Sequence, residues 1–224
     1  MKVNRSLRTP RAAGVAGIVF AALLASALVL LRLSAAQAGE NAHHWLSDAK
    51  VAWALQLVPF TGIAFLWLIG VVRDRIGERE DRFLATVSLG SGLLFVAMLF
   101  VAGGVSSGVL AALSGSSKEG WLIGRSIAAA LMHTYAMRMA AVFMISTSTI
   151  GLRTGFVPRW LAFSGYAIAL VLLLGIKVTL WVELLFPAWI LVLSLDILVE
   201  TLREGPRLPA AEEPWSEPEQ RKSA

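Results

Sequence analysis

Long apolar blocks that contain almost no charged residues dominate the sequence, and the clearest of them are residues 12–31 and 51–72. A bilayer core offers no water to backbone N–H and C=O groups, so a chain that crosses it forms α-helices or a closed β-barrel. A spanning helix needs about 20 residues, whereas a barrel strand needs about 10. The block length therefore argues against a barrel and predicts an all-α, polytopic transmembrane helical bundle.

Six spans are predicted, and short charged or glycine-rich connections separate them. Their approximate bounds are residues 12–32, 51–72, 83–105, 122–150, 160–177 and 184–202. The uncharged run between Arg11 and Arg32 is longer than the roughly 15 residues of a signal-peptide core, so we expect an uncleaved helix. The sequence AQAGE at 36–40 leaves cleavage open. The Gly- and Ser-rich stretch that follows Val105 predicts a loop or a loosened helix end.

Lys and Arg are unevenly divided between the two sides of these spans. Fourteen of the 20 fall on the side of the two termini and of the 73–82 and 153–159 loops. Five fall on the other side, and Arg138 lies within the membrane. Because cytoplasmic loops carry an excess of Lys and Arg, both termini are predicted to be cytoplasmic. Residues 204–224 are rich in Pro and Glu, which predicts a disordered cytoplasmic tail.

Composition bears on several function classes. The chain has no cysteine, which rules out disulfides, thiolate metal ligands and cysteine nucleophiles. The net charge of +5 is typical of oriented membrane proteins that contact anionic lipids, so no nucleic-acid partner is expected. Membrane lipids are the expected partners. A protein partner could dock on the cytoplasmic tail or on the charged 73–82 loop.

Arg138, inside the fourth span, is the residue least suited to its surroundings. An Arg at the centre of a spanning helix costs at least about 2.5 to 3.5 kcal/mol and usually faces a partner or a cavity. On a regular helix Thr134 shares its stripe, Tyr135 flanks it and His133 points about 140° away. Asp196 is the acid placed well inside another span, and it is the predicted partner of Arg138.

The sequence leaves three interpretations of this intramembrane polar site open. A structural tie between the two helices would fix their register. A polar pocket around Arg138 would bind a substrate, an ion or a lipid headgroup, and a long Arg side chain could instead extend to the interface. His133 is more often hydrogen-bonded to a neighbour than used as a proton relay. Haem ligation would need a second intramembrane His, so no cofactor is predicted.

Metal and catalytic motifs are weak or missing. The segment NAHHWLSDAK offers His43, His44 and Asp48 as zinc ligands, but adjacent histidines cannot face the same way on a helix and no further ligand cluster follows. No metal site is therefore predicted. The chain lacks a P-loop, an H-E-x-x-H motif and a G-x-S-x-G motif, which argues against an enzyme without excluding one.

Two stretches near the end of the chain, RTGFVPRWLAFSGYAIALVLLL at 153–174 and FPAWILVLS at 186–194, resemble a family of uncharacterised multi-pass membrane proteins of bacteria. The resemblance implies a six-helix bundle in a bacterial plasma membrane and carries no catalytic or binding residues. With no chemistry converging in the sequence, the predicted function is a non-enzymatic structural or partner-binding membrane protein. The alternative is a small transporter, or a lipid- or small-molecule-binding protein, with a pocket around Arg138.

Overall fold

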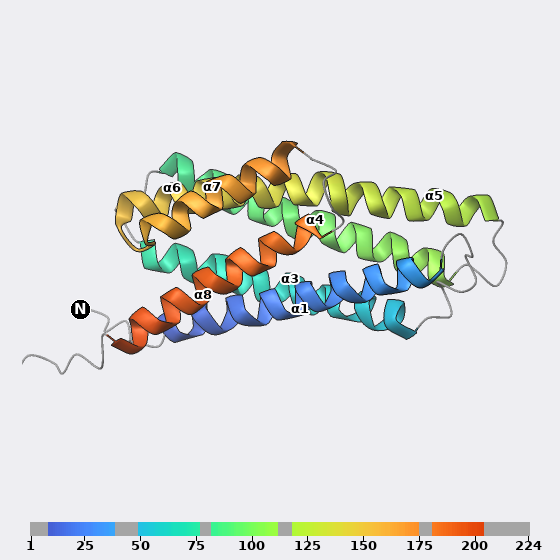
Figure 1. Ribbon diagram of the computed structural model, residues 1–224, viewed down its shortest axis with the longest axis horizontal. Helices are drawn as coiled ribbons and strands as arrows, with labels where there is room; N and C mark the ends of the chain where they lie inside the picture. Colours follow the sequence, from blue (N-terminus) through green and yellow to red (C-terminus); the bar gives the residue numbers. More distant parts are fainter. Residues whose placement is uncertain (1–8, 39–48, 77–81, 112–117, 175–180, 204–224) are drawn as a thin grey trace, which may run out of the picture.

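All helices of this computed structural model run roughly along one long axis, and the described ranges are 9–38, 49–76, 82–111, 118–174 and 181–203 (Figure 1). No strand occurs within these ranges, so the prediction of an all-α chain is confirmed. The elements in chain order are α1 (Thr9–Ala38), α3 (Ala49–Ile76), α4 (Arg82–Ala111), α5 (Lys118–Ala129), the π-helical η3 (Ala130–Ala136), α6 (Met137–Thr154), α7 (Arg159–Leu174), the 3-10 helix η4 (Val182–Leu184) and α8 (Leu185–Arg203).

Five helical segments of the described chain are long and apolar enough to cross a membrane. They are Gly14–Ser34, Ala49–Gly70, Arg82–Ala111, Leu122–Thr154 and Val182–Glu200. Five of the six predicted spans therefore correspond to helices of spanning length. The remaining one corresponds to α7, which is apolar but has only 16 residues. Residues 175–177 of that predicted span, and the predicted tail at 204–224, lie outside the described residues.

The Gly- and Ser-rich stretch after Val105, predicted to be a loop or a loosened helix end, is helical at residues 106–111, and its residues 112–117 lie outside the described residues. Helix α4 continues through it to Ala111. The hydroxyl of Ser106 donates a hydrogen bond to the carbonyl of Ala102 at 2.8 Å and so adds to the backbone bonds of the same helix. Helix α4 also packs against α5. Neighbouring helices and internal hydrogen bonds thus compensate for the low helix propensity of Gly and Ser.

The turn between α6 and α7 follows the sequence signals. Gly155 adopts a left-handed conformation with φ of 77°, and its N–H donates to the carbonyl of Gly151 at 2.9 Å. This conformation favours glycine at the position that follows a helix. Pro158 then precedes the first residue of α7. The break predicted between the fourth span and the fifth, residues 151–159, contains this Gly and this Pro.

Small residues allow close contacts between helices. A Cβ added at Gly17 of α1 would lie 1.9 Å from Ser194 Oγ of α8, and one added at Gly165 of α7 would lie 2.3 Å from Ser148 Oγ of α6. The indole N–H of Trp189 also donates to the carbonyl of Leu161 at 3.1 Å. These contacts attach α8 to α1 on one side and to α7 on the other.

Five phenylalanine rings from five helices form the centre of the bundle. They are Phe20, Phe65, Phe95, Phe143 and Phe186, from α1, α3, α4, α6 and α8. All five are buried, and the ring centroids of neighbouring pairs lie 4.5 to 6.2 Å apart, mostly edge to face. Tilted and edge-to-face pairs are favourable arrangements of aromatic quadrupoles. This phenylalanine cluster joins helices that are far apart in the sequence.

Helices α7 and α8 cover only part of the bundle. They extend from the end where α1 begins and α8 ends to about the middle of the long axis, whereas α5, the start of α3 and the ends of α1 and α4 continue beyond them (Figure 1). The α5, η3 and α6 segments form one uninterrupted helical rod along this length. The bundle therefore contains fewer helices beyond the middle of the molecule. The 3-10 helix η4 faces the long rod at this point, which we call the step.

Candidate functional site

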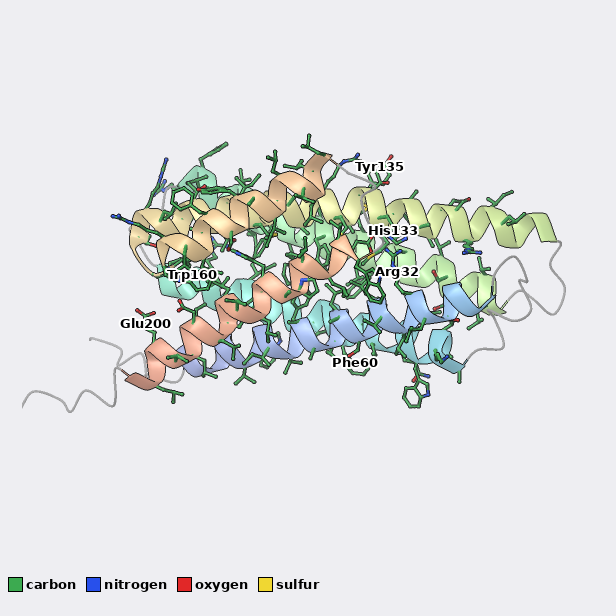
Figure 2. The ribbon with its side chains drawn as sticks, viewed as in Figure 1. Arg32, Phe60, His133, Tyr135, Trp160 and Glu200 are labelled. Carbon is green, nitrogen blue, oxygen red and sulfur yellow. The ribbon has the colours of Figure 1, made fainter. Side chains whose placement is uncertain are left out.

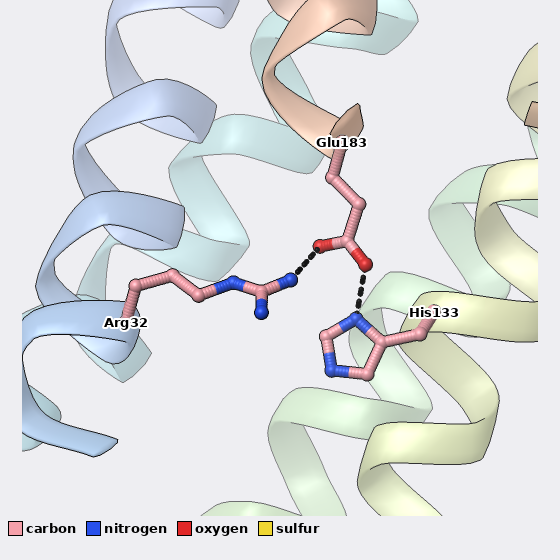
Figure 3. Close-up of polar contacts among 3 residues, drawn as sticks. All are labelled: Arg32, His133 and Glu183. Carbon is pink, nitrogen blue, oxygen red and sulfur yellow. Dashed lines mark hydrogen bonds and ion pairs between the residues drawn. The ribbon is translucent and has the colours of Figure 1, made fainter. Parts of the chain in front are cut away.

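Glu183, in the 3-10 helix η4, lies between two cationic or polar side chains at this step (Figure 3). Its Oε1 atom contacts His133 Nδ1, and Arg32 Nη2 lies 3.1 Å from its Oε2 atom. The side chains of Glu183 and Arg32 are 13% and 18% exposed, whereas that of His133 is 45% exposed. Three segments of the chain, α1, η3 and η4, therefore meet in one polar contact, which we call the Glu183 triad.

The π-helical segment η3 sets the direction of His133. Within it, backbone bonds reach back five residues, as in the bond from the N–H of Met137 to the carbonyl of Met132. This wider turn changes the angle between successive side chains, so a regular helical wheel places His133 incorrectly relative to α6. Short π-helical segments inside α-helices are frequently found at functional sites. Here the segment carries the side chain that contacts Glu183.

Glu183 is not fully satisfied within the triad. Its Oε2 atom is buried and accepts no hydrogen bond of acceptable geometry from the described residues, although Arg32 Nη2 is close enough to form an ion pair. A buried carboxylate oxygen without a well-directed donor is costly, because the hydrogen bonds it made to water are not replaced. The triad thus holds Arg32 through charge more than through a directed hydrogen bond.

A cavity of about 310 Å³ opens directly beside the triad. Most of its wall is apolar and comes from α1, α3, α4, α5 and η3, and its lining includes Leu24, Leu28, Val58, Leu99 and Met132. Arg32 and His133 line it on the side of the triad. Arg125 of α5 also lines it. The cavity is therefore an apolar space with cationic groups at particular points of its wall.

The hydroxyls in the cavity wall add little polarity. Thr61 Oγ1 donates to the carbonyl of Leu57 at 2.8 Å, and Ser106 Oγ donates to the carbonyl of Ala102 at 2.8 Å. Both donors are thus occupied within their own helices. The groups of the wall that carry strong polarity are Arg32, Arg125 and His133.

The phenylalanine cluster lies just beyond the floor of the cavity. Phe20 is one helical turn from the lining residue Leu24, and Phe95 is one turn from the lining residue Leu99. In both helices the phenylalanine lies toward the end of the bundle where α1 begins and α8 ends. The five packed rings therefore separate the cavity from that end of the bundle.

The structure does not join Arg138 to Asp196. Arg138 is half-buried in α6, and the described residues show no hydrogen bond or ion pair between it and Asp196. Helix α8 packs mainly against α1, whereas α6 packs mainly against α4 and α7. Counted from the contact between His133 and Glu183, Asp196 also lies about 12 Å farther along the bundle than Arg138 does, at 1.5 Å per residue.

The other predicted site residues lie in different environments. Tyr135 is 56% exposed and points away from Arg32 and His133 (Figure 2). Thr134 is half-buried beside it in η3. Of the five residues of the predicted site, the structure places His133 alone in the Glu183 triad.

The sequence held a signal for the triad. Arg32 ends the first predicted span, and Glu183 precedes the last one, so the predicted topology places both on the same side of the membrane. His133 lies near the start of the fourth span on that side. The midplane charge of Arg138 favours an acid inside a span as its partner, whereas Arg32 and Glu183 lie at span ends.

The described residues bring no group of three His, Cys, Asp or Glu side chains into metal-binding arrangement. The zinc ligands considered above, His43, His44 and Asp48, lie outside the described ranges. Comparison with protein-family models, with curated proteins and with solved structures finds no match for this chain.

Proposed function

We propose that this chain is a multi-pass protein of a bacterial cell membrane that binds a lipid-like amphiphile in the cavity beside the Glu183 triad. The cavity is the observation that carries the proposal. It combines an apolar wall with a few charged groups, which is the usual composition of small-molecule sites, and its volume of about 310 Å³ lies at the small end of their range. A structural or partner-binding role alone would not require such a space.

The spacing of charged and aromatic residues supports a position for the membrane. From Arg73 to Trp53 in α3, and from Arg153 in α6 to His133 in η3, the chain advances about 20 residues, or about 30 Å. That distance matches the hydrocarbon thickness of a bilayer. From Glu200 to Trp181 the advance is nearly the same. The triad would then lie at the outer headgroup level.

At this position the cavity would extend from the headgroup level into the acyl-chain region of the bilayer. Its floor at Leu24 would lie about 12 Å below Arg32, within the acyl-chain region. Arg125 and the rest of α5 would stand beyond the bilayer on the outer side. An amphiphile could then keep its tail at the depth of acyl chains and its head at the level of headgroups.

Six spans and cytoplasmic termini complete the proposed topology. Helix α7 is about 24 Å long at 1.5 Å per residue. It begins at Arg159, at the proposed inner boundary marked by Arg73 and Arg153. It would cross most of the hydrocarbon core. The uneven division of Lys and Arg supports termini on the cytoplasmic side.

Binding is favoured over transport and over catalysis. The phenylalanine cluster lies between the cavity floor and the inner end of the bundle, and a transported molecule would have to separate those packed rings. The triad contains an acid and a His, but it lies at the side of an apolar space whose lining hydroxyls, those of Thr61 and Ser106, are hydrogen-bonded within their own helices. We therefore propose a non-enzymatic binding protein.

Mass spectrometry of co-purifying amphiphiles tests this function. Wild-type protein, purified in a detergent that is then exchanged, should retain a near-stoichiometric amphiphile. Ala128→Phe should lose it, because Ala128 is buried in the cavity wall and the added ring would fill the space. Val15→Phe is the matched control, since Val15 is 53% exposed on α1. Equal amphiphile content in wild type and both variants would contradict the proposal.

A further inference from the structure

The cavity wall carries two guanidinium groups and an imidazole. Arg32 belongs to α1, Arg125 belongs to α5 and His133 belongs to η3, so three separate elements bring nitrogen donors to one space. Guanidinium groups bind carboxylates and phosphates through paired, charge-assisted hydrogen bonds. Among the described residues that line the cavity, none is an Asp or a Glu.

Glu183 already shows how an oxyanion sits at this position. Its carboxylate lies between Arg32 and His133, with one oxygen toward each (Figure 3). The oxygen nearest Arg32 lacks a well-directed hydrogen bond. A ligand carboxylate or phosphate that entered from the cavity side could meet the same two side chains with better geometry.

We propose that the cavity selects a single-chain amphiphile with an oxyanion head, and that Glu183 is an internal competitor for Arg32 and His133. This inference rests on the proposed function and specifies the ligand class. The tail occupies the apolar wall, and the carboxylate or phosphate head pairs with Arg32 and His133. Glu183 holds these two groups in place while the cavity has no ligand.

Volume limits the tail. A space of about 310 Å³ holds roughly ten groups the size of a water molecule. This is enough for one medium-length acyl chain and too small for the two chains of a phospholipid. The apolar wall also excludes a polar solute of the same size, because its hydrogen bonds to water would not be replaced.

The head group is tested with four ligands that share one tail: decanoate, decyl phosphate, decanol and decyltrimethylammonium. Binding of radiolabelled ligand is measured on the full chain in phosphatidylcholine nanodiscs, with empty nanodiscs subtracted. Decanoate or decyl phosphate should bind roughly 10- to 100-fold more tightly than decanol, as charge-assisted hydrogen bonds allow. The tighter of the two oxyanions identifies the head. Equal affinity for decanol and for both oxyanions would overturn the inference.

Two variants test the competitor role, with Arg159→Gln at the opposite end of the bundle as the matched control. Glu183→Gln should raise decanoate affinity by about tenfold, because Arg32 no longer pairs with a carboxylate. Arg32→Gln should lower it by a similar factor. Decanol affinity should stay the same in both. A fall in decanoate affinity in Glu183→Gln, with helicity and elution volume unchanged, would overturn the competitor role.

The outcomes separate this inference from the proposed function. If Ala128→Phe loses binding of all four ligands and the wild type binds all four equally, the cavity is a binding site. Selection of an oxyanion head is then rejected. No binding of any ligand in wild type would reject both. If nanodiscs containing phosphatidylglycerol lower decanoate binding, a two-chain lipid occupies the cavity and the single-chain inference fails. The comparison of the four ligands on wild-type protein needs no variant. It therefore tests oxyanion selection even if Glu183→Gln does not fold.

Discussion

Glu183 and Arg32 are the side chains on which the site depends. They are mostly buried, they come from opposite ends of the sequence, and their contact links η4 to α1. Breaking a buried charge pair by removing one partner is more harmful than removing both, because the remaining charge is left without compensation. The two residues should therefore behave as a unit in stability measurements.

A double-mutant cycle measures this coupling. Glu183→Gln and Arg32→Gln should each lower the free energy of unfolding by about 1 to 3 kcal/mol, and the double variant should lose less than the sum. Thermal unfolding in detergent, followed by circular dichroism, gives the values. His133→Ala should cost less, since His133 is 45% exposed. Additive losses in the double variant would show that the ion pair is not coupled.

Arg138 should contribute little to stability. No ion pair or hydrogen bond is found for it within the described residues, and at the proposed depth its side chain can extend toward the outer headgroup level. Arg138→Gln should then change the free energy of unfolding by less than about 1 kcal/mol. A loss as large as that of Arg32→Gln, measured by the same thermal unfolding, would mean that Arg138 has a structural partner after all.

Among elements, the π-helical segment η3 is the one that the site requires. It interrupts the regular rod formed by α5 and α6 at the level of Glu183, and it turns His133 toward that residue. Without it, the side chains of α5 would change direction relative to those of α6. The segment therefore connects α5, which lines the cavity, to α6, which packs against α4 and α7.

Deleting one residue from η3 tests this role. Removal of Ala130, which is exposed, should convert the wide turn into a regular one and keep the helix continuous. The effect of His133→Ala on stability should then vanish in the deletion variant, because His133 no longer reaches Glu183. The control is His133→Ala in the full-length chain. An unchanged effect of His133→Ala would contradict the role assigned to η3.

Close approach of α1 and α8 depends on Gly17. A Cβ there would lie 1.9 Å from Ser194 Oγ, so the side chain of a Leu cannot fit without separating the helices. Gly17→Leu should lower the melting temperature, whereas Gly70→Leu should not, because a Cβ added at Gly70 meets no atom within 4 Å. Equal melting temperatures for the two variants would show that the contact is loose.

At the scale of the whole molecule, apolar block length predicted most of the fold. It predicted the helices and their approximate bounds, because a spanning helix must satisfy its backbone internally and needs a minimum length. The site was harder to predict. The triad joins Arg32, His133 and Glu183, which are far apart in the sequence. Only the packing of α1, η3 and η4 brings them together. The π-helical turn also changed the side-chain directions that a regular wheel assumes.

Cysteine accessibility tests the proposed membrane position, and the chain has no native cysteine to interfere. Ser126→Cys in α5 should react with a membrane-impermeant maleimide added to intact cells, because α5 stands beyond the proposed boundary. Thr154→Cys at the inner end of α6 should react only after permeabilisation. Leu170→Cys is the control: Leu170 is 57% exposed in the structure but would face lipid and stay unlabelled. Protection of Ser126→Cys would place the boundary farther out.

Photo-crosslinking with a decanoate that carries a diazirine near the end of its tail tests the central claim most directly, because it locates the bound chain. The protein is labelled in phosphatidylcholine nanodiscs, digested and mapped by mass spectrometry. The proposed function predicts modification at the cavity wall, at residues such as Leu28, Leu99 and Met132, and loss of it in Ala128→Phe. Modification confined to lipid-facing residues such as Phe60, Trp67 and Leu170, equal in wild type and Ala128→Phe, would contradict it.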